Sequence, residues 1–230
     1  MIVALADDLT GAAEIGGMAW RYGLSTEIQT EFLPAAKVDL IVVDTDTRSC
    51  TSQEAAQRVA AVAEQCQRAG IVRIFKKVDS VLRGPVLSEL TALLETLGGR
   101  RALLVPANPS LGRTIREGCY WVGDKPLHQT DFANDPEYPA TTSDVKQILL
   151  QRSGADMAAR WPVEVLRTTE ILPSSGIIIG ESACVEDLGH WAKNLDEGTV
   201  PVGAAEFFAA FLASNGYSPT RKTPPQLANS

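Results

Sequence analysis

The stretch Ile2–Ala13, which reads Ile-Val-Ala-Leu-Ala-Asp-Asp-Leu-Thr-Gly-Ala-Ala, decides the fold class of this chain. Its first five residues are apolar, too few for a buried helix but suited to a parallel strand covered on both faces. Gly11 and the alanine-rich segment after it predict a helix that runs to Tyr22 and stops at Gly23. A strand followed directly by a helix is the repeating unit of a doubly wound α/β sheet.

Two acids, Asp7 and Asp8, end this first strand. Ligands of open α/β sheets collect beyond the carboxyl ends of the strands. We therefore expect both carboxylates at the functional edge, beside the helix amides of Gly11 and Ala12. The structural alternative is that Asp8 or Thr10 caps the helix while the other acid is solvated. Two adjacent acids on one strand end, followed by glycine, favour the functional interpretation.

The alternation of short apolar strands with amphipathic helices continues along the chain. Further strands are expected at residues 26–30, 39–44, 71–78, 101–105, 162–166 and 177–179, and helices at 52–69, 85–97, 143–152, 185–195 and 204–213. Pro85 stands where a first helical residue would. Residues 107–142 break the pattern and predict a long excursion with a hairpin around Gly123-Asp124-Lys125. The sequence thus predicts an α/β fold with a mostly parallel, doubly wound sheet flanked by helices, occupying residues 1–215 before a disordered tail at 216–230.

The 230 residues carry 28 acidic and 21 basic side chains, a formal net charge of −7. This balance disfavours binding along a nucleic-acid backbone, whereas small anions remain suitable ligands. No apolar run has the length of a membrane helix and Met1 begins directly on a strand, so we expect no membrane contact and a cytoplasmic location. Four scattered cysteines and two histidines argue against a disulfide framework and against a metal site.

A second polar cluster follows the strand expected at 71–78. It contains Lys76 and Lys77 at the strand end and then Asp79, Ser80, Arg83 and Gly84 before the next helix. Cations, a hydroxyl and backbone amides at one helix N-terminus make a site for a carboxylate or a phosphate. The alternative is a solvated loop in which Asp79 caps the helix and Lys76 is exposed.

Two other arginines stand in loops. Arg48 follows the strand at 39–44, and its guanidinium could form a fork around a carboxylate. A polar loop with one Asx turn fits the same spacing equally well. Arg113, in the loop 106–114, is a more remote anion contact, because an isolated loop of this kind favours a structural role.

Taken together, these loops resemble the amino-terminal domain of the four-carbon acid sugar kinases. The motifs that carry the resemblance are, in order, Ala6–Ala12, Thr47–Ser49, Lys76–Gly84, Pro106–Thr114, Gly118–Pro136 and Val202–Phe207. The likeness extends to about Asn215. It departs at Val81 and Pro85, where family members usually carry Thr and Asn, and at Asn108, whose position is often aromatic.

The resemblance implies the sugar-acid-binding half of an ATP-dependent kinase that phosphorylates the terminal hydroxyl of threonate, erythronate or 3-oxo-tetronate. It makes Asp7 and Asp8 the catalytic pair, one of them accepting or orienting the hydroxyl proton. It implies a substrate-binding set of Arg48, Lys77, Asp79, Ser80, Arg83, Gly84 and Arg113. The family uses ATP and Mg²⁺, but a carboxy-terminal domain supplies most of the nucleotide site, so we expect that site on a separate polypeptide.

Three functions remain open at this point. The chain could be half of a split kinase, a binding or regulatory module that recognises a sugar acid without turnover, or a remnant with structural value alone. Retention of both acids and of the Lys/Arg loop disfavours the remnant, because clustered unpaired charges destabilise a fold unless a ligand or partner uses them. Apolar surface left open where a second domain docks predicts a partner subunit or a homo-oligomer.

Overall fold

The computed structural model describes residues 1–151 and 161–220, which contain one large parallel sheet. Its eight strands run in the order β2-β3-β1-β4-β11-β5-β10-β9. Their bounds are β1 Ile2–Ala6, β2 Thr26–Gln29, β3 Leu40–Asp44, β4 Ile74–Lys77, β5 Arg101–Val105, β9 Val163–Leu166, β10 Gly176–Gly180 and β11 Thr199–Gly203. The predicted α/β class and the doubly wound parallel sheet are confirmed.

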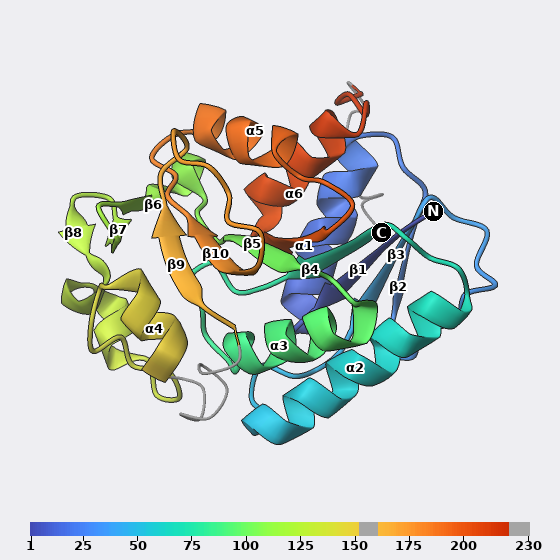
Figure 1. The fold of residues 1–230 in the computed structure, drawn as a ribbon, viewed down its shortest axis with the longest axis horizontal. Coiled ribbons are helices and arrows are strands. Elements are labelled where there is room, and N and C mark those ends of the chain that lie inside the picture. The colour runs from blue at the N-terminus through green and yellow to red at the C-terminus, as the bar shows by residue number, and fades with distance from the viewer. Residues whose placement is uncertain (152–160, 221–230) are drawn as a thin grey trace, which may run out of the picture.

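Helices cover both faces of this sheet (Figure 1). Helices α2 (Ser52–Arg68) and α3 (Val86–Leu97) pack side by side on one face, and α4 (Val145–Gln151) lies near β9. Helices α1 (Leu9–Arg21), α5 (Val185–Lys193) and α6 (Ala205–Ser214) cover the opposite face. Successive residues of β1 divide between the two cores: Val3 and Leu5 pack toward α2 and α3, whereas Ala4 packs toward α1 and α6. A strand buried on both sides explains the uninterrupted apolar run.

The helix starts follow from local capping. Asp8 is the N-cap of α1, with its side chain accepting from the Gly11 amide, and Thr51 opens α2 with a capping box to Glu54. The prediction for Pro85 was one position off. Pro85 has a non-helical ψ of 51° and its carbonyl accepts from Glu89 N, so it is the N-cap of α3.

A small antiparallel sheet extends from the carboxyl end of β5. It consists of β6 (Arg113–Arg116), β7 (Cys119–Val122) and β8 (Lys125–Pro126), with short 3₁₀ turns before and after it at Pro109–Leu111, Leu127–Gln129 and Asp131–Asn134. The predicted hairpin at Gly123-Asp124-Lys125 is confirmed by the pairing of Val122 with Lys125, whereas β6 was not predicted. A bridge from Ile115 to Ser182 fixes this sheet against the segment after β10.

One predicted strand begins later than expected, and one strand was not predicted. The strand predicted at 71–78 begins only at Ile74, because Val72 is 90% exposed and pairing with β1 starts between Val3 and Ile74. Strand β11 was missed altogether, since Pro201 argues against an interior strand. The last residue of the helix predicted at 143–152 lies outside the described residues, and so does the tail from 221 onward. The last described residue, Thr220, donates its backbone N–H to Arg21 O at 2.8 Å.

The sheet has its topological switch point between β1 and β4. These strands are adjacent, yet α1 leaves β1 toward one face and α3 leaves β4 toward the other. In open α/β sheets the crevice at such a point is the place where ligands bind. The turns after β1, β3 and β4 therefore meet at one edge, where the predicted site residues lie. No helix in the described part of the chain is long and apolar enough to cross a membrane.

Candidate functional site

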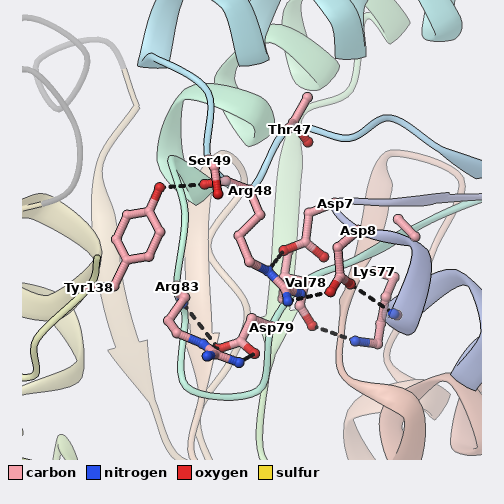
Figure 2. Close-up of polar contacts among 12 residues, drawn as sticks. Asp7, Asp8, Thr47, Arg48, Ser49, Lys77, Val78, Asp79, Arg83 and Tyr138 are labelled. Carbon is pink, nitrogen blue, oxygen red and sulfur yellow. Dashed lines mark hydrogen bonds and ion pairs between the residues drawn. The ribbon is translucent and has the colours of Figure 1, made fainter. Parts of the chain in front are cut away.

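Arg48 ties the turns after β1 and β3 together (Figure 2). Its Nε donates to Asp7 Oδ2 at 2.8 Å and its Nη1 donates to Asp8 Oδ2 at 2.5 Å. The backbone amides of Thr47 and Arg48 both donate to the Asp7 carbonyl, at 2.9 and 3.1 Å. Burial lowers the pKa of Arg48, but the hydrogen bond and charge of Asp7, together with the charges of Asp79 and Asp8, outweigh that effect and raise the pKa above its usual value. The Arg48 guanidinium, which was predicted to bind a ligand carboxylate, thus binds two carboxylates of the chain itself.

The two acids differ in how many partners they have. Asp8 is engaged at both oxygens, since Oδ1 accepts from Gly11 N at 2.7 Å and Oδ2 from Arg48. It is therefore both the helix cap of the structural alternative and a member of the site. Asp7 is 2% exposed, and its Oδ1 is buried without a hydrogen-bond partner among the described residues. A buried acceptor without a donor destabilises the fold, so this oxygen is the one that a bound donor would satisfy.

Lys77 and Gly11 fit closely against each other at the start of α1. The Lys77 ammonium lies 3.2 Å from Glu14 Oε2 and donates to the Val78 carbonyl at 3.0 Å. A Cβ added at Gly11 would stand 2.8 Å from Asp8 Oδ1 and 3.2 Å from Lys77 Nζ. Glycine at this position therefore lets a carboxylate and an ammonium approach the same helix N-terminus.

The turn after β4 is organised by a fork between Asp79 and Arg83 (Figure 2). Arg83 Nη2 donates to Asp79 Oδ1 at 2.9 Å and Nε to Oδ2 at 3.1 Å, while Nη1 donates to Asp135 Oδ2 at 3.2 Å. Burial raises the pKa of Asp79, but the hydrogen bonds and charge of Arg83 outweigh it and hold that pKa below its usual value. Gly84 follows with φ of +94°, and a Cβ there would stand 3.2 Å from the Arg48 carbonyl.

Lys76 and Glu89 form a buried ion pair near Asp7, and this pair was not predicted from the sequence. Lys76 Nζ is 3.1 Å from Glu89 Oε2, with the two side chains 0% and 1% exposed. Thr47 Oγ1 donates to the other Glu89 oxygen at 2.5 Å. Burial raises the pKa of Glu89, and the nearby Asp7 charge adds to this, while Lys76 opposes it. The alternative in which Lys76 is exposed was therefore wrong.

The excursion at residues 107–142 also contributes side chains to the site, and these were not predicted. Besides Asp135, Glu137 Oε2 accepts from Ser49 Oγ at 2.9 Å, and the Tyr138 hydroxyl donates to the Arg48 carbonyl (Figure 2). Arg113 reaches the same edge from β6, with Nη1 donating to Ser80 Oγ at 2.5 Å. The acidic and aromatic residues of 135–138 were the available signal, but they stand about fifty or more positions from their partners.

All nine predicted site residues thus lie at one edge of the sheet, in four groups. Asp7, Asp8 and Arg48 form the first, Lys77 the second, the turn Asp79–Gly84 the third, and Arg113 the fourth through Ser80. The charge of Asp79 also raises the pKa of Arg48, so the first and third groups interact electrostatically. The described residues contain no group of three or more His, Cys, Asp or Glu side chains placed to hold a metal ion.

Comparisons with known proteins show which family the chain resembles. Residues 2–210 match a family model described as a sugar-binding N-terminal domain. The chain is 32% identical over 211 residues to a D-threonate kinase from Bordetella bronchiseptica, covering 87% of this chain and 52% of that protein. It is 33% identical over 194 residues to a D-erythronate kinase from Heliobacterium modesticaldum, covering 82% and 42%.

A solved structure shows the same fold. It is a domain of unknown function from Bordetella bronchiseptica, a domain-swapped dimer with bound citrate, 27% identical with a TM-score of 0.77. It covers 91% of this chain, and this chain spans 55% of it. The chain therefore spans about half the length of the relatives that it matches. It belongs to the family of sugar-binding N-terminal domains of four-carbon acid sugar kinases.

Proposed function

We propose that this chain is the sugar-acid-binding half of an ATP-dependent kinase that phosphorylates the terminal hydroxyl of a four-carbon acid sugar of the threonate, erythronate or 3-oxo-tetronate type. Residues 1–215 form the binding unit in this proposal. The relatives that carry the same domain are named as D-threonate and D-erythronate kinases, and one related structure holds citrate, a hydroxylated polycarboxylate.

The unpartnered oxygen of Asp7 is the observation that supports the proposal. Its carboxylate is 2% exposed, with Oδ2 held by Arg48 and Oδ1 without a donor among the described residues. A substrate hydroxyl is a donor of the right kind, and a carboxylate within hydrogen-bond reach of an alcohol can orient it and accept its proton. Phosphoryl transfer relies mainly on such positioning and on charge neutralisation. In this proposal Asp7 binds the substrate hydroxyl, whereas Asp8 holds Arg48 and the start of α1 in place.

Nucleotide and metal are assigned to a separate half of the kinase. The described residues hold no cluster that fits a resident metal ion, and both Asp8 oxygens are engaged by Gly11 and Arg48. In the proposal, Mg²⁺ therefore enters with the nucleotide. ATP with Mg²⁺ would supply the phosphoryl group, and the residues of this chain would bind and orient the acceptor.

Calorimetric titration of D-threonate and D-erythronate tests the binding part. We expect the wild type and the exposed control Asp124→Asn to bind one of the acids equally, and Asp7→Asn to bind it at least about tenfold more weakly, since a hydrogen bond to a charged group is lost. A wild type that binds neither of these acids nor 3-oxo-tetronate, or Asp7→Asn with unchanged affinity, would contradict the proposal. Thermal stabilisation by ATP alone would contradict the division of labour.

A mixing experiment separates the kinase half from a binding module without turnover. The chain is combined with the separately produced carboxy-terminal half of the Bordetella D-threonate kinase, ATP and Mg²⁺. Transfer of phosphate to the sugar acid supports the kinase role, whereas tight binding without transfer favours the non-catalytic alternative.

The proposal also carries expectations about context. ATP-dependent metabolism of a small acid is a cytoplasmic activity, which agrees with a cytoplasmic location. The related Bordetella structure is a domain-swapped dimer. Self-association of this chain, or docking of a nucleotide-binding subunit, is therefore expected, and sedimentation at several concentrations checks it.

A further inference from the structure

The cationic side chains at the site differ in whether they pair with carboxylates of the chain. Arg48 pairs with two carboxylates, Lys77 with Glu14, and Arg83 with Asp79 and Asp135. Arg113 differs, because it forms no ion pair with any carboxylate of the described residues. Its neighbours are neutral: the Ser80 hydroxyl at 2.5 Å and the Phe132 ring, whose centroid lies 5.5 Å from Cζ. Its positive charge is therefore still available to an anion.

The register of the small sheet places Tyr120 beside Arg113. Arg113 pairs with Val122 and Ile115 with Tyr120, so these four side chains share one face of the β6–β7 ribbon. Diagonal neighbours on such a face lie within reach of long side chains. Ile115 and Tyr120 are both 0% exposed, which shows that this face is turned inward. Arg116 is on the opposite face, over Trp121.

The Tyr120 hydroxyl is a second group without a partner. It is buried and has no hydrogen bond within the described residues. Burial raises the pKa of Tyr120, and the charges that it feels are those of Arg113 and Asp79. The strand register sets Tyr120 beside Arg113, and the phenol remains a neutral donor at physiological pH. A buried phenol without a partner destabilises a fold unless a ligand satisfies it.

From these observations we infer that Arg113, Ser80 and Tyr120 form the subsite for the substrate carboxylate. The inference rests on the proposed function and deepens it by fixing the orientation of the acid. The carboxylate lies at the small sheet, and the chain of hydroxyls runs past the Asp79 turn to Asp7. Arg83, already occupied by two carboxylates, holds the turn together and does not bind the carboxylate.

A matched pair of ligands tests this orientation. D-Threonate and threitol differ only in that the carboxylate is replaced by a hydroxymethyl group, so the ratio of their affinities reports the carboxylate subsite. We expect Arg113→Met to reduce the preference for threonate by about 10- to 100-fold, and Arg116→Met, which removes the same charge from the opposite face, to leave it unchanged. Arg113→Lys, which retains the charge, should retain part of the preference and covers the case in which Arg113→Met folds poorly.

Tyr120→Phe removes only the hydroxyl and is expected to weaken threonate binding about tenfold while leaving threitol binding unchanged. An undiminished preference for threonate in folded Arg113→Met would overturn the subsite alone. Unchanged threonate affinity in Tyr120→Phe would remove Tyr120 from it. A wild type that binds none of the four-carbon acids would overturn the proposed function itself, which the other two outcomes leave intact.

Discussion

Substitution of Lys76 by Met is expected to destabilise the fold by about 3–5 kcal/mol at pH 7, because it leaves one member of a buried ion pair without the other. Lys76 and Glu89 are 0% and 1% exposed, with 3.1 Å between Nζ and Oε2. At an effective dielectric constant of about 20, charges at this separation attract by roughly 5 kcal/mol. Met has nearly the length of the lysine stem, so the packing term is small.

The pH dependence of this loss follows from Glu89. Its pKa in the folded state is already raised above the usual 4.5 by burial, and Lys76 opposes that rise. Without Lys76 the pKa rises further. A carboxyl group whose folded pKa is raised stabilises the fold below its unfolded pKa, and this contribution is lost as the pH rises through the folded pKa. The destabilisation should therefore be largest at neutral pH and shrink toward pH 4.5.

Urea unfolding followed by circular dichroism at pH 5 and pH 7 provides the measurement. With a slope of about 2–3 kcal/mol per M, the midpoint should fall by about 1–2.5 M at pH 7. The exposed control Lys37→Met should change it little, and the double variant Lys76→Met with Glu89→Gln should recover much of the loss, since no buried charge remains. A loss below about 1 kcal/mol, or equal losses at both pH values, would refute the reasoning.

Three further predictions concern single positions. Gly11→Ala should lower the melting temperature, because its Cβ displaces the Asp8 carboxylate that caps α1 and pairs with Arg48. It should also weaken sugar-acid binding about tenfold; a thermal melt and calorimetry measure the two effects. Asp79→Asn should lower the free energy of unfolding by about 1–2 kcal/mol at pH 7. The difference should vanish as the pH falls through the lowered pKa of Asp79, since a depressed carboxyl pKa stabilises only above it. Burial raises the pKa of Cys66 to about 11, so iodoacetamide at pH 8 should label the exposed Cys184 and spare Cys66 until urea is added, as mass spectrometry would show.

Much of the site follows from a general rule about sheets. Residues directly after parallel strands meet at one edge, so Asp7, Arg48 and Asp79 could be placed together from strand positions alone. The rule gives proximity but not pairing. It could not show that Arg48 and Arg83 are occupied by carboxylates of the chain, because side chains select their partners in three dimensions.

Strand β11 shows where local pattern fails. Its sequence Thr-Val-Pro-Val-Gly contains a proline, which normally excludes an interior strand. Pro201 is accommodated because β11 pairs with β4 only from Val202 onward, so the ladder on that side begins after the missing N–H. This irregularity depends on the length of a neighbouring strand, which the residues around Pro201 do not encode.

The buried pair of Lys76 and Glu89 was invisible for a related reason. Lys76 is followed by a second lysine at a strand end, a pattern typical of exposed residues. Glu89 lies on helix α3, whose predicted inward face consists of leucines. Each residue alone suggests a surface position. Only the packing of α3 against the sheet brings them together, and the Thr47 hydroxyl then completes the hydrogen bonding.

The charges at this edge support the proposed division of the kinase into two halves. In the proposed orientation the carboxylate of the substrate uses Arg113, the one cation of the described site residues without a carboxylate partner. The Asp7 and Asp8 side chains lie at the same edge, and ATP brings several negative charges. Phosphoryl transfer requires that charge on the transferred group be neutralised. Because the cations described here pair with other acids, the proposal expects that neutralisation to come from a nucleotide-binding half and its Mg²⁺, with this chain supplying the oriented hydroxyl.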